Sequence, residues 1–207
     1  MSKDIFTEYF YNNSWNGKES VSGPGSDYEQ TKYLIPEIQI LLKELNVKSI
    51  LDVPSGDFNW MRRVDLDGIK YIGGDIVDKM VKINNKKYGT KNILFKSIDI
   101  VNDSLPEVDL VMVRDCFVHL PNKDIFKAIN NIIDSKSKYL LTTNFMWRSP
   151  DANIDIKVGA WRRLNLEKAP FNFPFPKNII IEGNIQSYDR DKTMSLWYIK
   201  DLERYNG

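Results

Sequence analysis

The sequence has very few of the residues that form metal centres and disulfides. Its 207 residues include one cysteine, Cys116, and one histidine, His119. A single cysteine excludes a disulfide within the chain and favours a reducing compartment, so we expect a cytoplasmic protein. A metal site would have to rest on carboxylates, and no group of them has the spacing of a metal-binding motif. We therefore expect no metal.

Neither an excess of one charge nor a long apolar run is present. The 29 basic and 28 acidic residues leave a net charge of +1, which gives no reason to expect nucleic-acid binding. No apolar run reaches the roughly 18 residues of a membrane span, and the polar N-terminus does not resemble a signal peptide. The 42% hydrophobic residues are ordinary for a globular protein. We expect a single domain that binds neither nucleic acid nor a membrane.

Strand-like and helix-like segments alternate through the middle of the chain. Apolar strands separated by helices of this length predict a parallel sheet covered on both faces, a Rossmann-like, doubly wound α/β fold. Segments 178–187 and 193–201 are strand-like and joined by a polar turn, which predicts a terminal hairpin with an antiparallel last strand. The other predicted strands are 48–53, 70–74, 92–97, 108–113 and 138–143, and the predicted helices are 57–64, 77–88 and 122–133, the last beginning at an Asn cap.

Both flanks of this alternation have their own character. Residues 1–25 carry many aromatic side chains whose exposure would be costly, so we expect this arm to fold back over the main body. Residues 26–29 have capping-box spacing before a helix that contains Pro36, which predicts a kink or two short helices. Residues 144–177 lack clear periodicity, and loops this long are usually functional. The predicted parts of the domain are an arm and helix (1–46), a cofactor-binding core (47–143), a substrate lid (144–177) and a hairpin (178–207).

The most informative segment, 50–61, has the pattern of a buried strand, a tight polar turn and a helix start. Helix N-termini carry unpaired N–H groups and partial positive charge, and a glycine lets a ligand approach the backbone. Gly56 occupies one of the three glycine positions usual in such turns, and Pro54 and Phe58 occupy the other two. The turn is predicted to hold the anionic end of a nucleotide-like cofactor.

Two acidic residues follow the next two strands. Asp75, nineteen positions after Gly56, can accept hydrogen bonds from both hydroxyls of a ribose, or it can cap the helix that follows. Asp99, between Ile98 and Ile100, can accept from an adenine amine while its neighbours enclose the ring; otherwise it is a solvated loop carboxylate. Ligands of open α/β sheets bind outside the carboxyl ends of the strands, so three polar signals at three strand ends predict one cofactor site.

Asp115 and His119 follow the fourth predicted strand and are the candidate catalytic residues. If this segment begins as a helix, a spacing of four places both on one face. A histidine has an unperturbed pKa near ~6.5, which suits His119 to remove a proton from a hydroxyl acceptor, with Asp115 orienting it or binding the cofactor. The alternative is a structural His119 that is satisfied by a backbone hydrogen bond. An anionic acceptor would need no base at all.

Four segments resemble those of class I S-adenosylmethionine-dependent methyltransferases. They are 51–57 (LDVPSGD), 73–76 (GGDI), 97–100 (SIDI) and 108–115 (VDLVMVRD). The resemblance implies a seven-stranded sheet with an antiparallel last strand, and S-adenosyl-L-methionine as the cofactor. It departs from the family in the first segment, where Gly56 is the one glycine of three that is present. The cofactor-binding residues that it implies are Ser55, Gly56, Asp57, Trp60, Asp75, Ile76, Ser97, Asp99, Ile100 and Arg114.

More narrowly, 22–26 (SGPGS), 56–61 (GDFNWM), 114–116 (RDC) and 161–166 (WRRLNL) resemble a group of bacterial small-molecule methyltransferases, some of them encoded near surface-polysaccharide genes. This implies a small polar acceptor in capsular polysaccharide biosynthesis: an oxygen of a sugar, a sugar phosphate or a phosphoramidate. Arginines mixed with tryptophans suit an anionic acceptor, and the alternative is that the tryptophans form a lid core and the arginines are solvated. The expected substrate-binding residues are Trp15, Ser22, Trp147, Arg148, Trp161 and Arg162.

Two other function classes share the strand-end pattern. A nicotinamide-dependent reductase would be expected to keep more of the glycines around Gly56 and to lack the closing hairpin. A non-catalytic S-adenosylmethionine-binding partner of another methyltransferase is the second alternative, and the intact acids Asp75 and Asp99 argue against it. The sequence predicts no oligomeric state.

Overall fold

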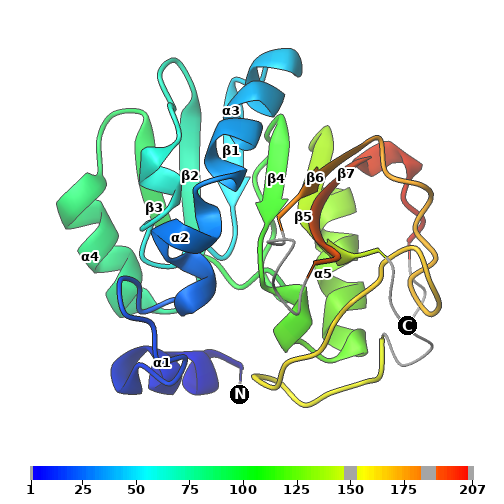
Figure 1. Ribbon diagram of the computed structural model, residues 1–207, viewed down its shortest axis with the longest axis horizontal. Helices are drawn as coiled ribbons and strands as arrows, with labels where there is room; N and C mark the ends of the chain where they lie inside the picture. The colour runs from blue at the N-terminus through cyan, green and yellow to red at the C-terminus, as the bar shows by residue number, and fades with distance from the viewer. Residues whose placement is uncertain (1, 147–152, 183–189, 205–207) are drawn as a thin grey trace. The chain divides into compact units, whose positions relative to one another are not determined.

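Seven strands form one mixed sheet in the order β3-β2-β1-β4-β5-β7-β6 (Figure 1). The computed structural model describes residues 2–146, 153–182 and 190–204. The predicted Rossmann-like α/β fold, mostly parallel with an antiparallel strand at the C-terminus, is confirmed. The strands are β1 (Ser49–Asp52), β2 (Lys70–Asp75), β3 (Ile93–Ser97), β4 (Leu110–Val113), β5 (Tyr139–Phe145), β6 (Asn178–Ile181) and β7 (Lys192–Tyr198).

The chain divides into two compact units, unit 1 up to Asp99 and unit 2 from Ile100 onward. In unit 1, β1, β2 and β3 run parallel, and the register pairs Ser49 with Lys70 and Tyr71 with Ile93. Helix α4 (Asp78–Tyr88) packs on β2 and β3. The predicted strands 48–53, 70–74 and 92–97 and the predicted helix 77–88 therefore agree with the structure to within a residue or two.

The N-terminal part of unit 1 contains a helix that the sequence pattern did not predict, α1 (Ser2–Asn12). The expected break near Pro36 is confirmed, because α2 (Tyr28–Thr31) ends before α3 (Leu34–Glu44) begins. Pro36 lies in the first turn of α3, where its missing N–H and fixed φ are tolerated. The predicted apolar stripe of α3 is buried at Leu34, Ile38, Leu41 and Leu42.

Two local predictions in unit 1 are wrong. Residues 57–64 do not form a helix; after a turn, a single 3₁₀ turn, η2, spans Met61–Arg63. The reason is backbone conformation, since Gly56 (φ 53°) and Phe58 (φ 61°) both lie in the left-handed region. The capping box at 26–29 is also absent, because the carboxylate of Glu19 accepts the Tyr28 N–H at 3.0 Å.

Phe58 occupies its left-handed position because its side chain is buried. Its ring packs at 5.1–5.3 Å between centroids against Tyr71, Tyr88 and Phe95. Tyr71 in turn donates a buried hydrogen bond of 2.5 Å to the carboxylate of Asp52, and burial raises the pKa of the Tyr71 phenol well above its usual value. The aromatic cluster thus offsets a strained backbone in the turn after β1. The adjacent Val53–Pro54 peptide bond is cis.

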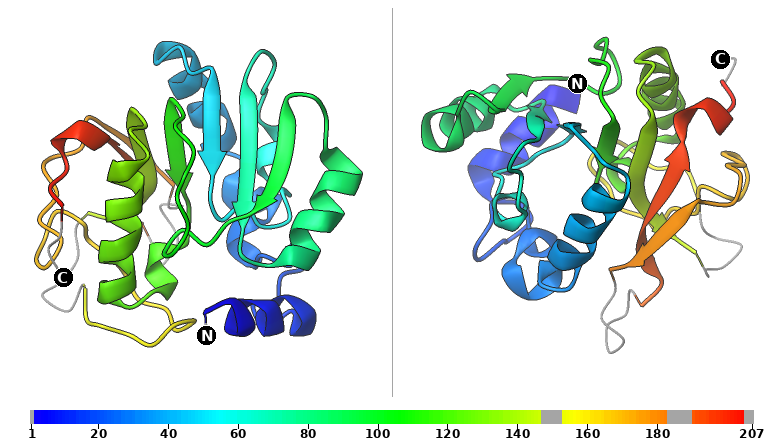
Figure 2. Two further views of the ribbon diagram at one scale, coloured as in Figure 1. Left: turned by 180° about the vertical axis from the view of Figure 1, so that it is seen from behind. Right: turned by 90° about the horizontal axis from the view of Figure 1, so that it is seen from above.

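Unit 2 contains the other four strands, and Figure 2 shows β7 beside β5 and β6 on the far side of β7. β4 and β5 are parallel, whereas β7 pairs antiparallel with β5 from Tyr139–Tyr198 to Phe145–Lys192. β6 pairs antiparallel with β7, so the predicted terminal hairpin pairing is confirmed. Every residue of β4 and β5 is buried.

Helix α5 (Asn122–Asp134) buries Ile125, Ala128, Ile129 and Ile132, at the spacing of one helix face. The predicted Asn cap is wrong, because the capping residue is Pro121. The Asn122 N–H instead donates to the carboxylate of Asp155 at 2.7 Å. A residue far along the chain therefore caps this helix. In the part of the chain that the structure describes, no helix is long and apolar enough to cross a membrane.

The described part of segment 144–177 is held by buried amides and apolar side chains. The side-chain amide of Asn153 donates to the carbonyls of Asn165 and Ala169, each at 2.8 Å, and its oxygen accepts the Asn165 N–H at 2.8 Å. The side chain of Asn144, in β5, accepts the Leu166 N–H at 2.9 Å. The segment thus folds without regular secondary structure, which explains its lack of periodicity. Its buried apolar side chains include Leu164, Leu166, Phe171 and Phe173.

Candidate functional site

The turn after β1 is held by the N-terminal arm. The hydroxyl of Ser22 accepts the Asp57 N–H at 3.1 Å, and the Asp57 carboxylate accepts the Ser20 hydroxyl at 2.9 Å and the Val21 N–H at 3.1 Å. A Cβ at Gly56 would lie 2.2 Å from the Ser22 oxygen, so this approach requires glycine. The arm therefore folds back onto the turn, as the aromatic composition of the arm predicted, and Ser22 is the group that comes close to Gly56.

Asp75 lies at the end of β2 and fixes the same turn. Its side chain is 4% exposed and accepts the N–H groups of Gly56 at 3.1 Å and of Val77 at 2.9 Å. Burial raises the pKa of this carboxyl to about 6, although the two N–H donors act in the opposite direction. The carboxylate thus serves the backbone between β2 and α4, but it does not cap the helix as the alternative predicted, because the capping residue of α4 is Val77 and has no side-chain cap. Its role toward a ribose stays a prediction.

Ser55 and Asn84 add two polar groups to this turn. The Ser55 N–H donates to the Gly74 carbonyl at 2.7 Å, while its buried hydroxyl has no hydrogen-bond partner among the described residues. The Asn84 amide, which is 1% exposed, donates to the Gly56 carbonyl at 2.7 Å. Sequence reasoning missed Asn84. The available signal was a polar residue four positions after Met80 on the buried face of α4.

The remaining residues with a predicted cofactor role in unit 1 follow β1, β2 and β3. Asp99 is half-buried after β3, and the side chain of Ile98 packs beside Gly74 at the end of β2. The Ser97 hydroxyl donates to the carboxylate of Asp78 at 2.6 Å. Trp60 is buried and Ile76 is half-buried. The ends of β2 and β3 are neighbours, with Asp75 paired to Ser97 in the register, so the structure brings these predicted residues to one edge.

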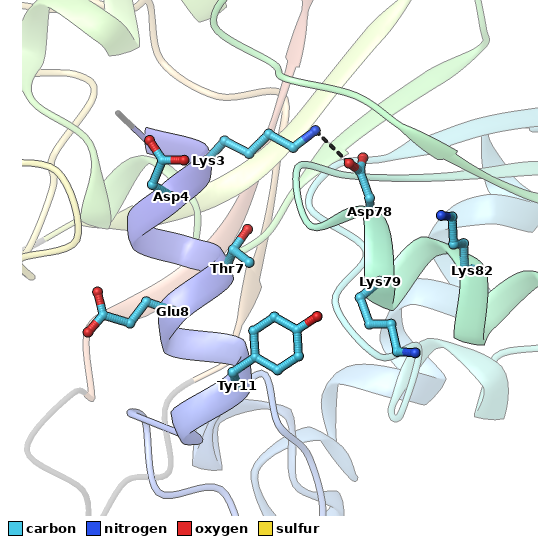
Figure 3. Close-up of a pocket in the computed structure, with 8 residues that line it drawn as sticks. All are labelled: Lys3, Asp4, Thr7, Glu8, Tyr11, Asp78, Lys79 and Lys82. Carbon is cyan, nitrogen blue, oxygen red and sulfur yellow. Dashed lines mark ion pairs between the residues drawn. The ribbon is translucent and has the colours of Figure 1, made fainter.

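Trp15, predicted to bind substrate, belongs to an aromatic cluster of the arm. Its ring lies 5.3 Å from that of Tyr9 and 6.3 Å from that of Phe6, between centroids. Helix α1 also flanks an open pocket of about 610 Å³ (Figure 3), where Lys3 pairs with Asp78 of α4 at 2.8 Å. The side chains around this pocket carry both signs of charge, so they do not favour one class of ligand.

Unit 2 holds a cluster of four charged side chains, two of them buried and two half-buried, which we call the ion cluster. Lys192 contacts the carboxylates of Asp115 at 2.6 Å and Glu182 at 2.8 Å. Arg114 pairs with Glu182 and lies 3.5 Å from Asp115. The side chains of Arg114 and Glu182 are only 4% and 3% exposed, and two cations balance two anions. Sequence reasoning missed Lys192 and Glu182, because they come from the hairpin and no local motif marks them.

The ion cluster determines the state of Asp115. Burial alone would raise the pKa of this carboxyl, but Lys192 and Arg114 outweigh burial and hold the pKa well below its usual value. The backbone of Asp115 is left-handed (φ 50°), and its N–H donates to the Thr143 hydroxyl at 2.8 Å. Asp115 is therefore a permanent anion at neutral pH. The Arg114 guanidinium, predicted to bind the cofactor, is already paired with carboxylates of unit 2.

His119 lies in the 3₁₀ turn η3 (Phe117–His119), so the predicted shared helix face with Asp115 is wrong. The left-handed backbone of Asp115 prevents a helix from running through both residues. Even so, the two groups interact, since the Asp115 charge raises the pKa of the imidazole. Burial is the larger effect and lowers that pKa below its usual value. Ring atom Nδ1 lies 2.9 Å from the Ala160 carbonyl oxygen.

The lid residues with a predicted substrate role separate into three groups. Trp147 and Arg148 lie outside the described residues. The Trp161 ring is 46% exposed and stacks with the guanidinium of Arg163 at 5.3 Å. Arg162 is buried and donates to the Phe117 carbonyl at 3.0 Å and to the Asn122 side chain at 2.8 Å. Among these residues Trp161 is thus the one that the structure leaves most accessible.

The described residues give no sign of a metal centre. Across 2–146, 153–182 and 190–204, no group of three or more His, Cys, Asp and Glu side chains could hold a metal ion. Cys116, the single cysteine, is half-buried in unit 2.

Comparison with known proteins shows the fold. No family model and no curated protein matches the sequence. Magnesium protoporphyrin IX methyltransferase from Synechocystis PCC 6803, solved with bound S-adenosylmethionine, is similar at a TM-score of 0.64 and 14% identity, over 96% of this chain and 97% of that one. N-methyltransferase NodS from Bradyrhizobium japonicum WM9 is similar at a TM-score of 0.54 and 12% identity, over 79% of this chain and 94% of that one.

Human N-acetylserotonin methyltransferase, solved with S-adenosylmethionine, is similar at a TM-score of 0.57 and 15% identity, over 81% of this chain and 52% of that one. This chain thus spans about half the length of that enzyme. The seven-stranded sheet is the Rossmann-like fold of class I S-adenosylmethionine-dependent methyltransferases. At identities of this size, likeness to solved structures establishes the fold of this chain and not its activity.

Proposed function

We propose that this protein is an S-adenosylmethionine-dependent methyltransferase that acts on a small polar acceptor. The observation that supports this proposal best is the turn after β1. There, Gly56 has a left-handed backbone, Asp75 is a buried acceptor at the end of β2, and the buried hydroxyl of Ser55 has no partner among the described residues. Solved proteins with this fold bind S-adenosylmethionine, as two of the similar structures do.

The residues of unit 1 fit this cofactor. A buried hydroxyl without a partner costs free energy, and the hydroxyl of Ser55 would regain a hydrogen bond from a polar ligand group. Asp75 would accept from the ribose hydroxyls, and Asp99 from the adenine amine, with Ile98 and Ile100 enclosing the ring. S-adenosylmethionine, when bound, supplies a methyl group on a sulfonium sulfur, which keeps the bond pair when the methyl group leaves for the acceptor.

The candidate base lies in unit 2. A histidine that removes a proton must be neutral at the working pH, and burial lowers the pKa of His119 below its usual value. The Ala160 carbonyl can only accept, so Nδ1 of the ring carries a hydrogen and Nε2 is the basic nitrogen. His119 thereby meets the chemical requirement for accepting a hydroxyl proton. Asp115, an anion held by Lys192, would favour the imidazolium that forms.

The finer substrate assignment rests on sequence resemblance. Segment 144–177 contains arginines and the exposed Trp161. Side chains of these two types suit a sugar or a phosphorylated sugar. Resemblance to a bacterial group linked with surface polysaccharides adds a phosphoramidate oxygen to the candidates. Arg114 and Arg162 are engaged in hydrogen bonds or ion pairs of unit 2, so they are weaker candidates for binding an anion than the sequence pattern suggested. The cytoplasmic location expected from the single cysteine completes the proposal.

Calorimetry with S-adenosylhomocysteine and with NADH tests the cofactor. We expect binding of the first and none of the second; the reverse result would favour the nicotinamide-dependent reductase. Asp75→Asn should weaken binding, because an amide presents donors where the site needs an acceptor. Asp67→Asn, a change to an exposed acid in the turn before β2, is the matched control and should leave binding intact.

Turnover on a panel of sugars, sugar phosphates and phosphoramidates tests the reaction. His119→Asn should lower kcat by about 10²–10⁴-fold on a neutral hydroxyl acceptor, the usual contribution of a general base. Binding of S-adenosylhomocysteine should not change, which separates the base from the cofactor site. A near-normal rate in this variant would show that the acceptor is already anionic or that His119 is structural. Binding without turnover on any acceptor would favour the non-catalytic partner.

A further inference from the structure

The lid stretch 159–162 is hydrogen-bonded to the His119 turn along its length. The Gly159 N–H donates to the His119 carbonyl at 2.9 Å, and the Arg162 N–H donates to the Val118 carbonyl at 3.1 Å. Between these two backbone bonds, the Ala160 carbonyl accepts from the His119 ring at 2.9 Å. The position of the Ala160 oxygen is therefore set by how well this stretch stays on the turn.

Arg162 anchors the stretch from its C-terminal end. Its side chain is 7% exposed, and its two outer nitrogens reach different elements: one donates to the Phe117 carbonyl at 3.0 Å, the other to the Asn122 side chain at 2.8 Å. Burial lowers the pKa of this guanidinium to about 10, although the Asp155 charge raises it. A cation buried against neutral acceptors is costly, so its planar fork serves geometry more than ion pairing.

The Ala160 carbonyl selects one form of the imidazole. A carbonyl oxygen has no hydrogen to donate, so the neutral ring must carry its hydrogen on Nδ1 to make this bond. Nε2 is then left with its lone pair. If the stretch moved away, the ring would lose a bond that favours hydrogen on Nδ1, and the share of the ring with its hydrogen on Nε2 would rise.

We propose that Arg162 is a positioning residue that holds stretch 159–162 on the turn, so that the Ala160 carbonyl keeps the His119 hydrogen on Nδ1 and leaves Nε2 as the base. This inference rests on the proposed function, in which Nε2 receives the acceptor's hydroxyl proton. Once it does, both ring nitrogens carry hydrogen and Nδ1–H still donates to Ala160, so one contact serves both states of the ring.

The groups that shift the pKa of the His119 ring lie in unit 2. Burial lowers that pKa most strongly, the hydrogen bond to Ala160 and the charge of Asp115 raise it, and Lys192 and Arg162 lower it. Removing Arg162 removes one charge that opposes protonation, but losing the Ala160 bond with it removes a larger effect that favours protonation. We therefore expect the ratio of the two ring tautomers, rather than the pKa, to report the loss of Arg162.

Nuclear magnetic resonance tests the inference directly, because the chain has one histidine. Long-range proton–nitrogen spectra of the full chain, prepared without a histidine tag, report which ring nitrogen carries the hydrogen and how the ring titrates. In the natural sequence we expect Nδ1–H as the major neutral form. In Arg162→Gln the ratio of Nδ1–H to Nε2–H should fall about two- to tenfold, the change expected for loss of one hydrogen bond.

Two further variants keep the test decisive. Arg162→Lys retains the charge but cannot bridge Phe117 and Asn122 with a planar fork, so it should shift the ratio in the same direction even if Arg162→Gln fails to fold. Arg163→Gln removes the neighbouring charge, whose guanidinium lies over the Trp161 ring, and should leave the ratio unchanged. In an active preparation, the pH profile of kcat/KM for Arg162→Lys should move with the His119 titration.

Either of two results would overturn the inference: Nε2–H as the major form in the natural sequence, or a ratio in Arg162→Lys that equals that of the natural sequence. These spectra need no cofactor and no acceptor. Failure to bind S-adenosylhomocysteine would therefore remove the proposed function while leaving the spectra as they are, and the two failures can be told apart.

Discussion

Asp75 and Asp115 are residues of the same type just at or beyond the ends of two strands, yet their carboxyl groups shift in opposite directions. Asp75 is buried against the N–H groups of Gly56 and Val77, and burial raises its pKa to about 6. Asp115 is also desolvated, but Lys192 at 2.6 Å and Arg114 at 3.5 Å hold its pKa well below the usual range. Neutral N–H donors offset in part the rise in pKa that burial causes, whereas nearby cations turn that rise into a fall.

The difference separates the chemistry of the two units. In unit 1, no cation is among the groups that fix the state of Asp75, so its carboxylate keeps the capacity to accept from ligand hydroxyls. In unit 2, the ion cluster is balanced internally and stabilises Asp115 as an anion near His119. Backbone N–H donors in one unit and a neutralised ion cluster in the other are thus two distinct ways to satisfy an aspartate that is withdrawn from water.

The largest effect is expected from breaking the ion cluster. Lys192→Met removes one of two cations and leaves the buried carboxylate of Glu182 and the half-buried carboxylate of Asp115 with Arg114 alone, so the free energy of unfolding should fall by about 3 kcal/mol. Urea denaturation measures the loss. Lys177→Met breaks an exposed pair with Asp201 in the same unit and should cost about 1 kcal/mol or less. Equal losses of unfolding free energy in the two variants would show that the ion cluster stabilises the protein no more than an exposed ion pair does.

The next effect concerns the turn after β1. Gly56→Ala should destabilise the protein by about 2–4 kcal/mol, because it adds a Cβ at φ 53° and places it 2.2 Å from the Ser22 oxygen. Gly68→Ala, at φ 71° with nothing within 4 Å of the new Cβ, isolates the cost of the backbone alone. If the Ser22 contact matters, the cost of Gly56→Ala shrinks in a Ser22→Gly background. An unchanged cost there would assign the whole effect to the backbone.

A smaller, pH-dependent effect is expected from Asp75. Its pKa is raised in the folded state, so its contribution to stability is fully present below pH ~4 and is lost as the pH rises through about 6. The loss amounts to up to about 3 kcal/mol across this range. Asp75→Asn should abolish this slope when unfolding is measured from pH 4 to pH 7. A slope that is the same in both proteins would show that Asp75 is not the group responsible.

The same residue should give cofactor binding a pH dependence. Ribose hydroxyls donate to an ionised carboxylate, so affinity for S-adenosylhomocysteine should fall as the pH drops through about 6, by up to about tenfold per pH unit. Calorimetry at several pH values measures this. The affinity of Asp75→Asn should be lower and nearly independent of pH. A flat profile in the natural protein would argue against a ribose at Asp75.

The smallest effect on stability is expected from Ser55. Ser55→Ala removes a buried hydroxyl that has no partner among the described residues, so stability should stay the same or rise by about 1 kcal/mol, while S-adenosylhomocysteine binding weakens. Ser135→Ala removes a hydroxyl that donates to the Ile132 carbonyl at 2.7 Å and should instead lose about 1 kcal/mol. A loss of stability in Ser55→Ala without a change in binding would mean that this hydroxyl serves the fold.

Sequence patterns predicted most of the regular strands and helices well. Strand runs such as β2 and the apolar face of α5 carry their own periodicity, and the break before Pro36 follows from the geometry of proline. The patterns failed where a distant group decided the local structure. Glu19 replaced the predicted capping box, Asp155 replaced the predicted Asn cap, and a buried Phe58 stabilised a turn where a helix was expected.

The candidate site divides in the same way. The spacing from Gly56 to Asp75 is local to β1, the turns after it and β2, and it indicated that both residues lie close together. Lys192 reaches Asp115, Glu182 reaches Arg114 and the Ala160 carbonyl reaches His119, each from a segment at least 40 residues away. No pattern of neighbouring residues records those approaches, so the state of Asp115 and the hydrogen-bond partner of His119 could not be derived from it.

The sequence by itself determined the run of regular strands, the helices α4 and α5, and the polar residues at the strand ends. These follow from periodicity and from backbone conformations that each residue type allows. The tertiary structure alone decided which charges are paired, which carboxyl group is raised or lowered in pKa, why position 56 requires glycine, and which carbonyl the His119 ring meets. Those properties depend on burial and on partners brought together by the sheet, because electrostatic interactions act through space and not along the chain.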